Sequence, residues 1–160
     1  MFVHSPPPLA DCLSRQPRLQ GLQGLFPGPE PGLPHQELRQ IISLLTEQYA
    51  AQEKRDLSSY MRFFWKSPLV ACFTEDFVAI GWNQVKASVK REFAGRPAQT
   101  RPILERLRTN LLDGQTAITI EWWTLLFPSG KASGFTNSTW HKFPEGWLII
   151  QTHTDSSGLR

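Results

Sequence analysis

One histidine near the end of the chain is well suited to proton transfer. His153 lies in the apolar–polar run from Gly146 to Asp155, and a histidine side chain gains or loses a proton near neutral pH. General acid–base catalysis requires that property. The alternative is a histidine that only hydrogen-bonds a neighbouring strand or helix. The sequence leaves both interpretations of His153 open.

One glutamate is the second candidate. Glu121 interrupts the most apolar stretch of the chain, residues 118–127, where burial disfavours an ionised carboxylate unless a partner compensates. A carboxyl group in such a place, facing a pocket, is a candidate catalytic acid or base. The competing interpretation pairs Glu121 with Arg106 or Arg108 of the preceding strand, as a cross-strand ion pair on a dimer face.

Aromatic side chains are candidates for the wall of a ligand cavity, because their flat faces bury much area against a flat ligand. A plain hydrophobic core is the alternative role. Tyr60 adds a hydroxyl donor of the type that stabilises an oxyanion. The predicted ligand-binding residues are Tyr60, Phe64, Trp65, Trp82, Trp123 and Asn137.

Other chemistries lack a motif in this sequence. None of the four histidines has the spacing of metal ligands. We find no P-loop, no dinucleotide-binding glycine fingerprint and no nucleophile elbow. We therefore expect no metal and no cofactor. The net charge of +3 is too small to indicate a nucleic-acid partner.

The cysteine count and the hydropathy bear on location. Cys12 and Cys72 are too few for a disulfide framework, and they are consistent with a reducing compartment, so we expect a cytoplasmic protein. No apolar run approaches the ~20 residues of a membrane helix. Pro6–Pro8 interrupt the N-terminus where a signal peptide would need an apolar core.

The first 34 residues differ in composition from the rest. Eight of the 13 prolines fall here, interleaved with glycines. Such a segment buries too little apolar surface to offset the entropy of ordering it. We expect residues 1–34 to be a disordered tail and residues 35–158 to form one domain. A polyproline ligand at Pro6–Pro8 is the alternative role for the tail.

Three helices and a hairpin are expected before residue 100, because apolar residues recur there at helical spacing. Asp56 is a suitable N-cap for the second helix and Asn83 for the third. The expected elements are a helix from His35, a helix over 57–64, a β-hairpin over 69–82 and a helix over 83–95.

The rest of the chain is typical of an antiparallel meander. The expected strands are 101–112, 115–127, 134–143 and 146–155. Regular alternation puts Trp147, Ile149 and His153 on one face of the last strand, although a single β-bulge would reverse the assignment. Helices followed by a meander predict an α+β domain, with the helices on one side of a curved sheet.

Three stretches carry a family resemblance. The first comprises KRDLSSYM (54–61) and FWKSP (64–68), the second is AIGWNQV (79–85) and the third is FPEGWLIIQTHTD (143–155). They resemble the NTF2-like superfamily, in particular its SnoaL-like branch and the small bacterial proteins grouped as DUF4440. In those proteins the closing strand runs tryptophan, a few apolar residues, then His-x-Ser; Asp155 replaces that serine here. The resemblance covers about residues 36 to 155.

The resemblance implies a cone, in which a strongly curved, mainly antiparallel mixed sheet wraps around three helices. It also implies a pocket at the open end and a homodimer through the outer face of the sheet. The superfamily holds isomerases, cyclases, dehydratases, transport factors and oligomerisation modules. The steroid isomerases among them place a base near Ala71–Phe73, where this chain has no carboxylate.

Two functions follow from the resemblance. The first is a small-molecule-binding pocket protein, for a small apolar or aromatic ligand, of the cofactor-free isomerase, dehydratase or cyclase type. The second is a non-catalytic binding or homo-oligomerisation module. Because fold does not imply function, the sequence does not decide whether the protein is an enzyme.

Overall fold

The computed structural model describes residues 33–157, which form three helices and six strands. The helices are α1 (Leu33–Glu53), α2 (Leu57–Met61) and α3 (Trp82–Gly95). The strands are β1 (Ala71–Thr74), β2 (Val78–Ile80), β3 (Arg101–Leu111), β4 (Thr116–Phe127), β5 (Gly130–Phe143) and β6 (Gly146–Ser157). The predicted tail lies outside the described residues, together with Pro6–Pro8 and Cys12, except that Leu33 and Pro34 already belong to α1.

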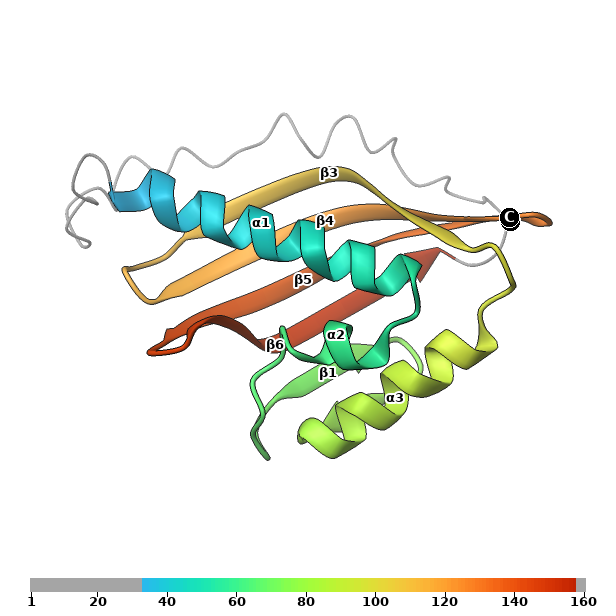
Figure 1. Ribbon diagram of the computed structural model, residues 1–160, viewed down its shortest axis with the longest axis horizontal. Coiled ribbons are helices and arrows are strands. Elements are labelled where there is room, and N and C mark those ends of the chain that lie inside the picture. The colour runs from blue at the N-terminus through green and yellow to red at the C-terminus, as the bar shows by residue number, and fades with distance from the viewer. Residues whose placement is uncertain (1–32, 158–160) are drawn as a thin grey trace, which may run out of the picture.

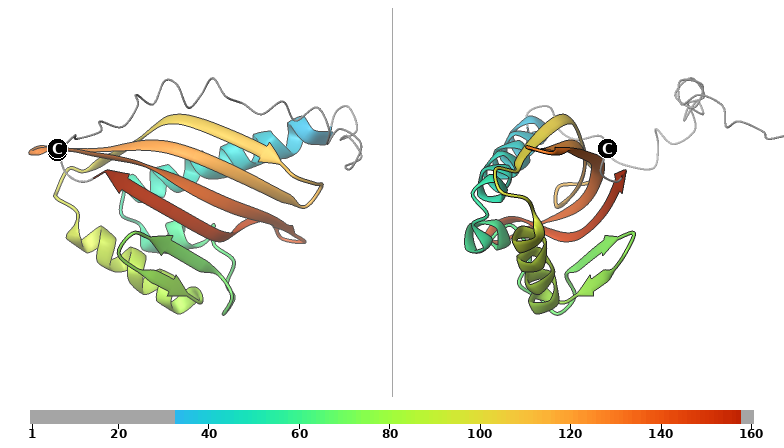
Figure 2. Two further views of the ribbon diagram at one scale, coloured as in Figure 1. Left: turned by 180° about the vertical axis from the view of Figure 1, so that it is seen from behind. Right: turned by 90° about the vertical axis from the view of Figure 1, so that its right-hand side faces the viewer.

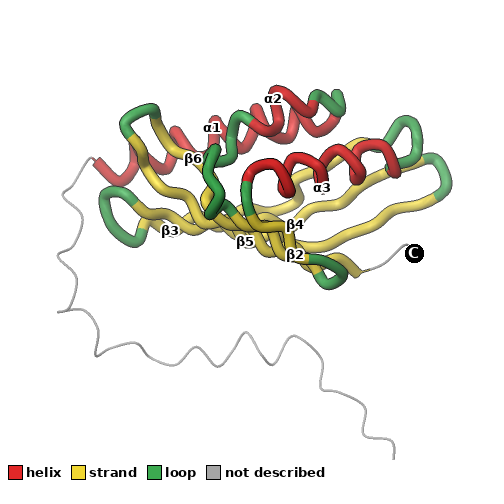
Figure 3. The backbone as a smooth tube through the Cα atoms, turned by 90° about the horizontal axis from the view of Figure 1, so that it is seen from below, coloured by secondary structure: helices red, strands yellow, loops and turns green. Residues whose placement is uncertain are grey.

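All six strands form one curved sheet, in the order β2-β1-β6-β5-β4-β3. β1 is parallel to β6, and every other neighbouring pair is antiparallel. The three helices lie on one side of the sheet (Figure 3), and the long strands curve around them (Figures 1 and 2). The predicted α+β cone, a mixed curved sheet around three helices, is confirmed.

The hydrophobic core fills the space between the helices and the inner face of the sheet. Ile41 and Leu45 of α1 are wholly buried there, as are Trp140 of β5 and Ile149 of β6. Burial of each such side chain contributes ~1.5–3 kcal/mol. The helical spacing of the apolar residues in α1 therefore serves to attach that helix to the sheet.

The second helix begins as predicted but ends early. The Asp56 carboxylate accepts hydrogen bonds from the Ser59 backbone N–H at 3.0 Å and from the Ser59 hydroxyl at 2.6 Å, which confirms the N-cap. The helix was expected to continue to residue 64. It stops at Met61 because the next backbone groups bond to β6, where Ile149 N–H donates to the Phe63 carbonyl at 2.8 Å.

The predicted cap of the third helix is wrong. Gly81, not Asn83, occupies the N-cap of α3, with a φ of 89° and no side-chain hydrogen bond. Glycine adopts that positive φ without steric cost, and a Cβ at this position would meet the Pro68 carbonyl oxygen at 3.4 Å. The chain turns here directly from β2 into the helix.

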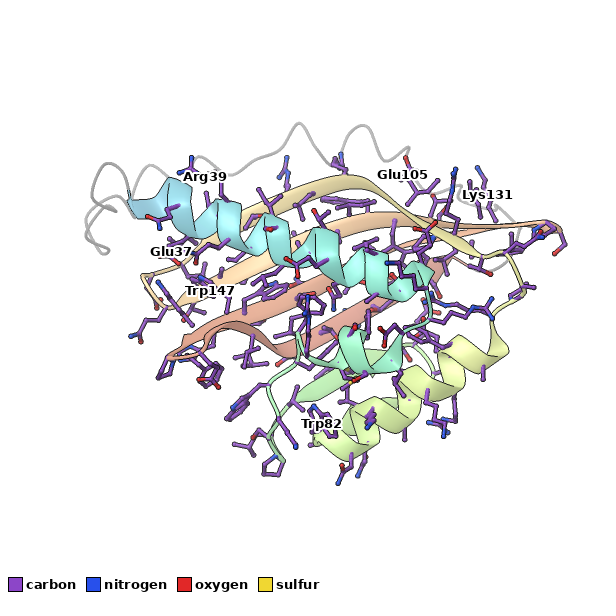
Figure 4. The ribbon with its side chains drawn as sticks, in the orientation of Figure 1. Glu37, Arg39, Trp82, Glu105, Lys131 and Trp147 are labelled. Atoms are coloured by element: carbon purple, nitrogen blue, oxygen red, sulfur yellow. The ribbon has the colours of Figure 1, made fainter. Side chains whose placement is uncertain are left out.

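A carboxylate fastens the start of α1 to the far end of the sheet. Glu37 accepts hydrogen bonds from Lys142 Nζ and from Trp147 Nε1, both at 2.7 Å; Figure 4 shows Glu37 and Trp147 close together. The hydrogen bond from Lys142 is the main cause that lowers the pKa of Glu37. These contacts fix the direction in which α1 crosses the sheet.

Two β-bulges decide which side chains face inward. The pairing of β3 with β4 shifts between Leu104 and Arg106, and the pairing of β5 with β6 shifts at Ile150. Before Ile150, the inner side chains of β6 are Trp147 and Ile149, both buried. After it, the inner side chains are those of the even-numbered residues, beginning with Thr152.

The expectation that Trp147, Ile149 and His153 share one face of the last strand is therefore wrong. His153 is exposed and lies opposite Asn137 of β5, on the outer side of the sheet. A bulge adds one residue to one strand of a pair and so reverses the alternation beyond it. Separately, no helix in the described part of the chain is both long and apolar enough to span a membrane.

Candidate functional site

A cavity of about 660 Å³ lies between the helices and the inner face of the sheet. That volume is in the range of small-molecule sites. The helical side combines an apolar patch, formed by Phe64, Val85 and Val89, with polar side chains that include Tyr49, Tyr60 and Arg96. The side formed by β5 and β6 carries hydroxyl groups, from Thr136, Ser138, Thr152, Thr154 and Ser156. A ligand would thus meet one apolar patch and hydrogen-bonding groups on both sides of the cavity.

Glu121 of β4 is the buried acid of this cavity. Its side chain is 4% exposed. Three hydroxyl groups donate to it: Thr119 Oγ1 at 2.9 Å, Ser138 Oγ at 3.0 Å and, at a longer 3.4 Å, Tyr49 Oη. The Thr119 hydroxyl in turn accepts a hydrogen bond from Trp140 Nε1 at 3.1 Å. The carboxyl group is therefore held in one orientation by its neighbours.

Burial dominates the ionisation of this group. Removal from water raises the pKa of Glu121 above its ordinary value, and the hydrogen bonds from Thr119, Ser138 and Tyr49 offset only part of that rise. A carboxyl group with a raised pKa is a better proton donor at neutral pH, and a stronger base once ionised, than a solvated one. Perturbed carboxyl groups of this kind are common at functional sites.

Two tyrosines extend from the helices into the same cavity. Burial is the main cause that raises the pKa of both hydroxyls, so Tyr49 and Tyr60 stay protonated and act as donors. Tyr60 packs edge-on against Phe93, with ring centroids 5.4 Å apart. Cys72 of β1 also lines the cavity, and burial raises the pKa of its thiol to about 11. That thiol is consequently not a nucleophile at neutral pH.

The end of α3 supplies a buried cation. The Arg96 side chain is 9% exposed, and its guanidinium lies over the Phe93 ring, 5.4 Å from the ring centroid. It pairs with Glu92 four residues earlier. With the Gln52 amide oriented to present its oxygen, that oxygen accepts from Arg96 Nη1 at 3.0 Å and Nη2 at 2.7 Å. Both Arg96 and Gln52 line the cavity.

The structure brings only some of the predicted site residues together. Glu121, Tyr60, Phe64 and Trp123 all line the cavity. Trp123 lies over Gly134 and donates from Nε1 to the Thr136 hydroxyl at 3.1 Å. Four of the predicted residues thus share one site.

The other predicted site residues lie elsewhere. Trp65 stacks on Phe143, with ring centroids 5.3 Å apart, and Trp82 carries the ammonium groups of Lys66 and Lys86 over its ring. Neither lines the cavity. Asn137 faces outward because it alternates with the buried Ser138 and Trp140 of β5. His153 faces outward because of the bulge at Ile150, so the expectation that His153 faces the cavity is wrong.

The competing interpretation of Glu121, an ion pair with Arg106 or Arg108, is wrong, because both arginines lie opposite outward-facing residues of β4. The bulge in β3 directs Arg106 outward, where its guanidinium stacks on Trp122, 3.7 Å from the ring centroid. Glu121 lies on the opposite face of the sheet. Glu121 is therefore a buried carboxyl group that accepts hydrogen bonds from hydroxyl groups, and it forms no surface ion pair.

Sequence reasoning missed three cavity residues. Tyr49 belongs to the apolar stripe of α1, so its spacing predicts a residue of the hydrophobic core. Ser138 is one of many polar residues in β5, although its spacing of two from the buried Trp140 is a signal that it faces inward. Arg96 follows the last helical residue and reads as a solvated cation. Within residues 33–157, no group of three or more potential metal ligands is close enough to hold a metal ion.

Comparison with known proteins bears on the fold. No family model matches the sequence, and no curated protein does. Among solved structures, an NTF2-like protein of unknown function from Shewanella oneidensis is 20% identical, with a TM-score of 0.67 over 76% of this chain and 98% of the other. An NTF2-like superfamily protein from Salmonella enterica is 16% identical, with a TM-score of 0.69 over 78% and 94% of the two chains.

A third similar structure has a name that refers to a reaction. It is a protein from Novosphingobium aromaticivorans, provisionally named as a scytalone dehydratase, 12% identical with a TM-score of 0.70 over 80% of this chain and 89% of the other. At these identities the likeness concerns architecture alone. Together with the curved mixed sheet and the three helices on its inner side, it shows that this chain has the NTF2-like fold.

Proposed function

We propose that the protein binds a small, largely apolar molecule in the cavity and that Glu121 exchanges a proton with it. The observation that carries the proposal is the position of Glu121, a 4% exposed carboxyl group with a raised pKa in the wall of a cavity of about 660 Å³. The reaction class is cofactor-free isomerisation, dehydration or cyclisation, which needs no more than acid–base groups.

Isomerisation of a β,γ-unsaturated ring ketone illustrates the chemistry. The Glu121 carboxylate takes a proton from the carbon next to the carbonyl, and the electron pair of that C–H bond moves to give an enolate. The Tyr49 hydroxyl, which lies in the cavity beside Glu121, donates a hydrogen bond to the enolate oxygen. The protonated Glu121 then returns the proton to another carbon of the conjugated system. The proton and the electron pair are both accounted for without a further reactant.

Other findings support this proposal. The reaction named for the Novosphingobium protein is a dehydration, which belongs to the same class. Membership of the SnoaL-like branch is part of the proposal and rests on residues 54–68, 79–85 and 143–155. A cytoplasmic location is also part of it and is supported by Cys72, a free thiol.

Hydrogen–deuterium exchange tests the proposal without knowledge of the substrate. The probe is 2-tetralone in D₂O, whose protons next to the carbonyl are followed by proton NMR. We expect the wild-type protein to exchange them at least about tenfold faster than Glu121→Gln, because a positioned base contributes ~10²–10⁴ in rate. Glu105→Gln is the matched control, since Glu105 is exposed on β3.

A second proposal concerns self-association. No helix within residues 33–157 covers the outer face of the sheet (Figure 3). This face bears the partly exposed side chains of Ile118, Ile120, Trp122 and Phe135. We infer that two copies pair through this face as a homodimer. The non-catalytic alternative, a binding or oligomerisation module, shares this interface and differs in predicting no exchange activity for Glu121.

A further inference from the structure

Two hydrogen-bond donors at the helical side of the cavity have no acceptor within the described part of the chain. The first is Arg96 Nε, which is buried and makes no hydrogen bond. The second is the Tyr60 hydroxyl, which makes no hydrogen bond within residues 33–157 and, unlike Arg96 Nε, is not closed off from the cavity. Both side chains line the cavity. A buried donor left unpaired costs about 1–3 kcal/mol, so the unpaired Arg96 Nε calls for an explanation.

The two donors flank the same ring. The centroid of the Phe93 ring lies 5.4 Å from the centroid of the Tyr60 ring. The Arg96 guanidinium lies over the same Phe93 ring, 5.4 Å from its centroid. Burial and the charge of Glu92 raise the pKa of the Tyr60 hydroxyl, and the charge of Arg96 offsets only part of that rise, so the hydroxyl stays protonated and can donate. The donors thus belong to one polar region at the end of α3, opposite the strand that carries Glu121.

The positive charge of this region is not fully balanced. The Arg96 side chain is 9% exposed, whereas that of its partner Glu92 is 53% exposed. Water therefore screens the carboxylate of Glu92 more than the buried guanidinium. Gln52 contributes an oxygen without a charge. A second anion on the cavity side would complete the pairing of Arg96.

We propose that the ligand is an aromatic or alicyclic carboxylic acid, whose carboxylate is bound by Arg96 and Tyr60. The proposal rests on the proposed function and names its substrate class. A carboxylate offers several lone pairs, and a negative charge, to the unpaired Arg96 Nε–H and to a hydroxyl at once, whereas a ketone or an alcohol offers no charge. The ring of the ligand lies against Phe64, Val85 and Val89, and its reacting carbon faces Glu121.

A matched pair of probes tests this class: biphenyl-4-carboxylate and biphenyl-4-carboxamide, which differ in charge and little in shape. Binding is measured by isothermal titration calorimetry. We expect the wild-type protein to bind the carboxylate at least about tenfold more tightly than the amide, which corresponds to about 1.4 kcal/mol. In Arg96→Gln the preference is expected to vanish while the amide still binds.

Two further variants separate charge recognition from folding. Tyr60→Phe removes the hydroxyl alone and is expected to weaken carboxylate binding about three- to tenfold, with the amide unchanged. Arg62→Gln removes the same charge from an exposed arginine that pairs with Glu47 outside the cavity, and it is expected to leave both affinities unchanged. If Arg96→Gln does not fold, Tyr60→Phe decides.

Equal affinity of the wild-type protein for the two probes would overturn this inference and leave the proposed function intact, because the amide would still report binding in the cavity. If neither the carboxylate nor the amide binds, the inference about the ligand class is also overturned. The proposed function is judged separately, by deuterium exchange into the neutral ketone. Loss of carboxylate preference in Arg62→Gln would place the recognition outside the cavity.

Discussion

Glu121 gains its chemical character from three hydroxyl groups and from its burial. Thr119, Ser138 and Tyr49 donate to its oxygens, yet burial prevails and its pKa is raised. A buried ion pair would have had the opposite effect, because a neighbouring cation favours the charged form. The fold therefore keeps this carboxyl group ready to give up or accept a proton.

The raised pKa makes stability depend on pH in a defined direction. The native protein binds the Glu121 proton more tightly than the unfolded chain does, because the pKa of this side chain in the unfolded chain is near the ordinary 4.5. The stabilisation is therefore complete below about 4.5 and is lost as the pH rises through the folded pKa. We expect the free energy of unfolding of the wild type, relative to Glu121→Gln, to fall by at least about 1 kcal/mol over that interval.

Urea titrations of the two proteins at a series of pH values measure this difference. The substitution keeps the size of the side chain and removes the titration. Parallel stability profiles for wild type and Glu121→Gln would show that burial does not govern the group. Wild-type stability that rises with pH relative to the variant would mean that the pKa is lowered.

At this scale the sequence predicted part of the site. Glu121 was identifiable because a carboxyl group in a long apolar run must be buried, paired or neutral. His153 was misplaced because one extra residue, Ile150, reverses the alternation of β6, and no rule of local composition locates that bulge. Arg96 was missed since a cation after a helix end is usually solvated, and only tertiary packing against Phe93 and Gln52 buries it.

At the scale of elements, one glycine of β5 allows the Trp123 ring and the backbone of β6 to lie close to that strand. A Cβ at Gly134 would lie 2.2 Å from the Asp155 carbonyl oxygen and 2.6 Å from Trp123 Cζ2. Those distances are far inside van der Waals contact. The absence of a side chain here lets Trp123 lie flat on β5 and hydrogen-bond Thr136.

We expect Gly134→Ala to lower the free energy of unfolding by about 1–3 kcal/mol, because the strand or the Trp123 ring must move. Gly95→Ala is the matched control: it lies at the end of α3, a Cβ there meets nothing within 4 Å, and the change should be neutral or slightly stabilising. Chemical denaturation followed by tryptophan fluorescence measures both. A Gly134→Ala protein as stable as the wild type would contradict the packing described here.

Most elements were predictable from local pattern, and the errors lie at their ends. The Asp56 cap and the order of helices and strands follow from spacing and capping chemistry. The early end of α2 and the cap at Gly81 do not, because β6 takes up the backbone at Phe63 and the turn at Gly81 needs a positive φ. Both depend on contacts distant in sequence.

At the scale of the whole molecule, the curved sheet separates two surfaces with different tasks. Its inner face forms the core and the cavity, and its outer face is the surface we propose for self-association. The overall architecture was predictable because the order of helices and strands, together with family-like stretches, constrains the topology strongly. The parallel pairing of β1 with β6 joins the β1–β2 hairpin to the sheet, so that β2 forms the edge opposite β3.

Light scattering after size exclusion tests the proposed dimer. We expect a dimer for the wild type at micromolar concentration and a monomer for Ile120→Glu, because a charge buried in an interface is costly. Ile120 lies opposite Arg108 on β3, which offers the new carboxylate a partner within the same protomer. Ile42→Glu, at an exposed aliphatic residue of α1, is the control and should remain a dimer. A monomeric wild type would contradict the proposal.

The pH dependence of deuterium exchange into 2-tetralone tests the central claim most directly, because it reports the base itself. We expect the protein-catalysed rate to increase with pH and to reach half its plateau above 4.5, the ordinary value for a glutamate, since burial raises the pKa of Glu121. The rate with Glu121→Gln is expected to equal that of buffer alone. A wild-type rate that matches Glu121→Gln at every pH would contradict the claim that Glu121 exchanges protons with a ligand in this cavity.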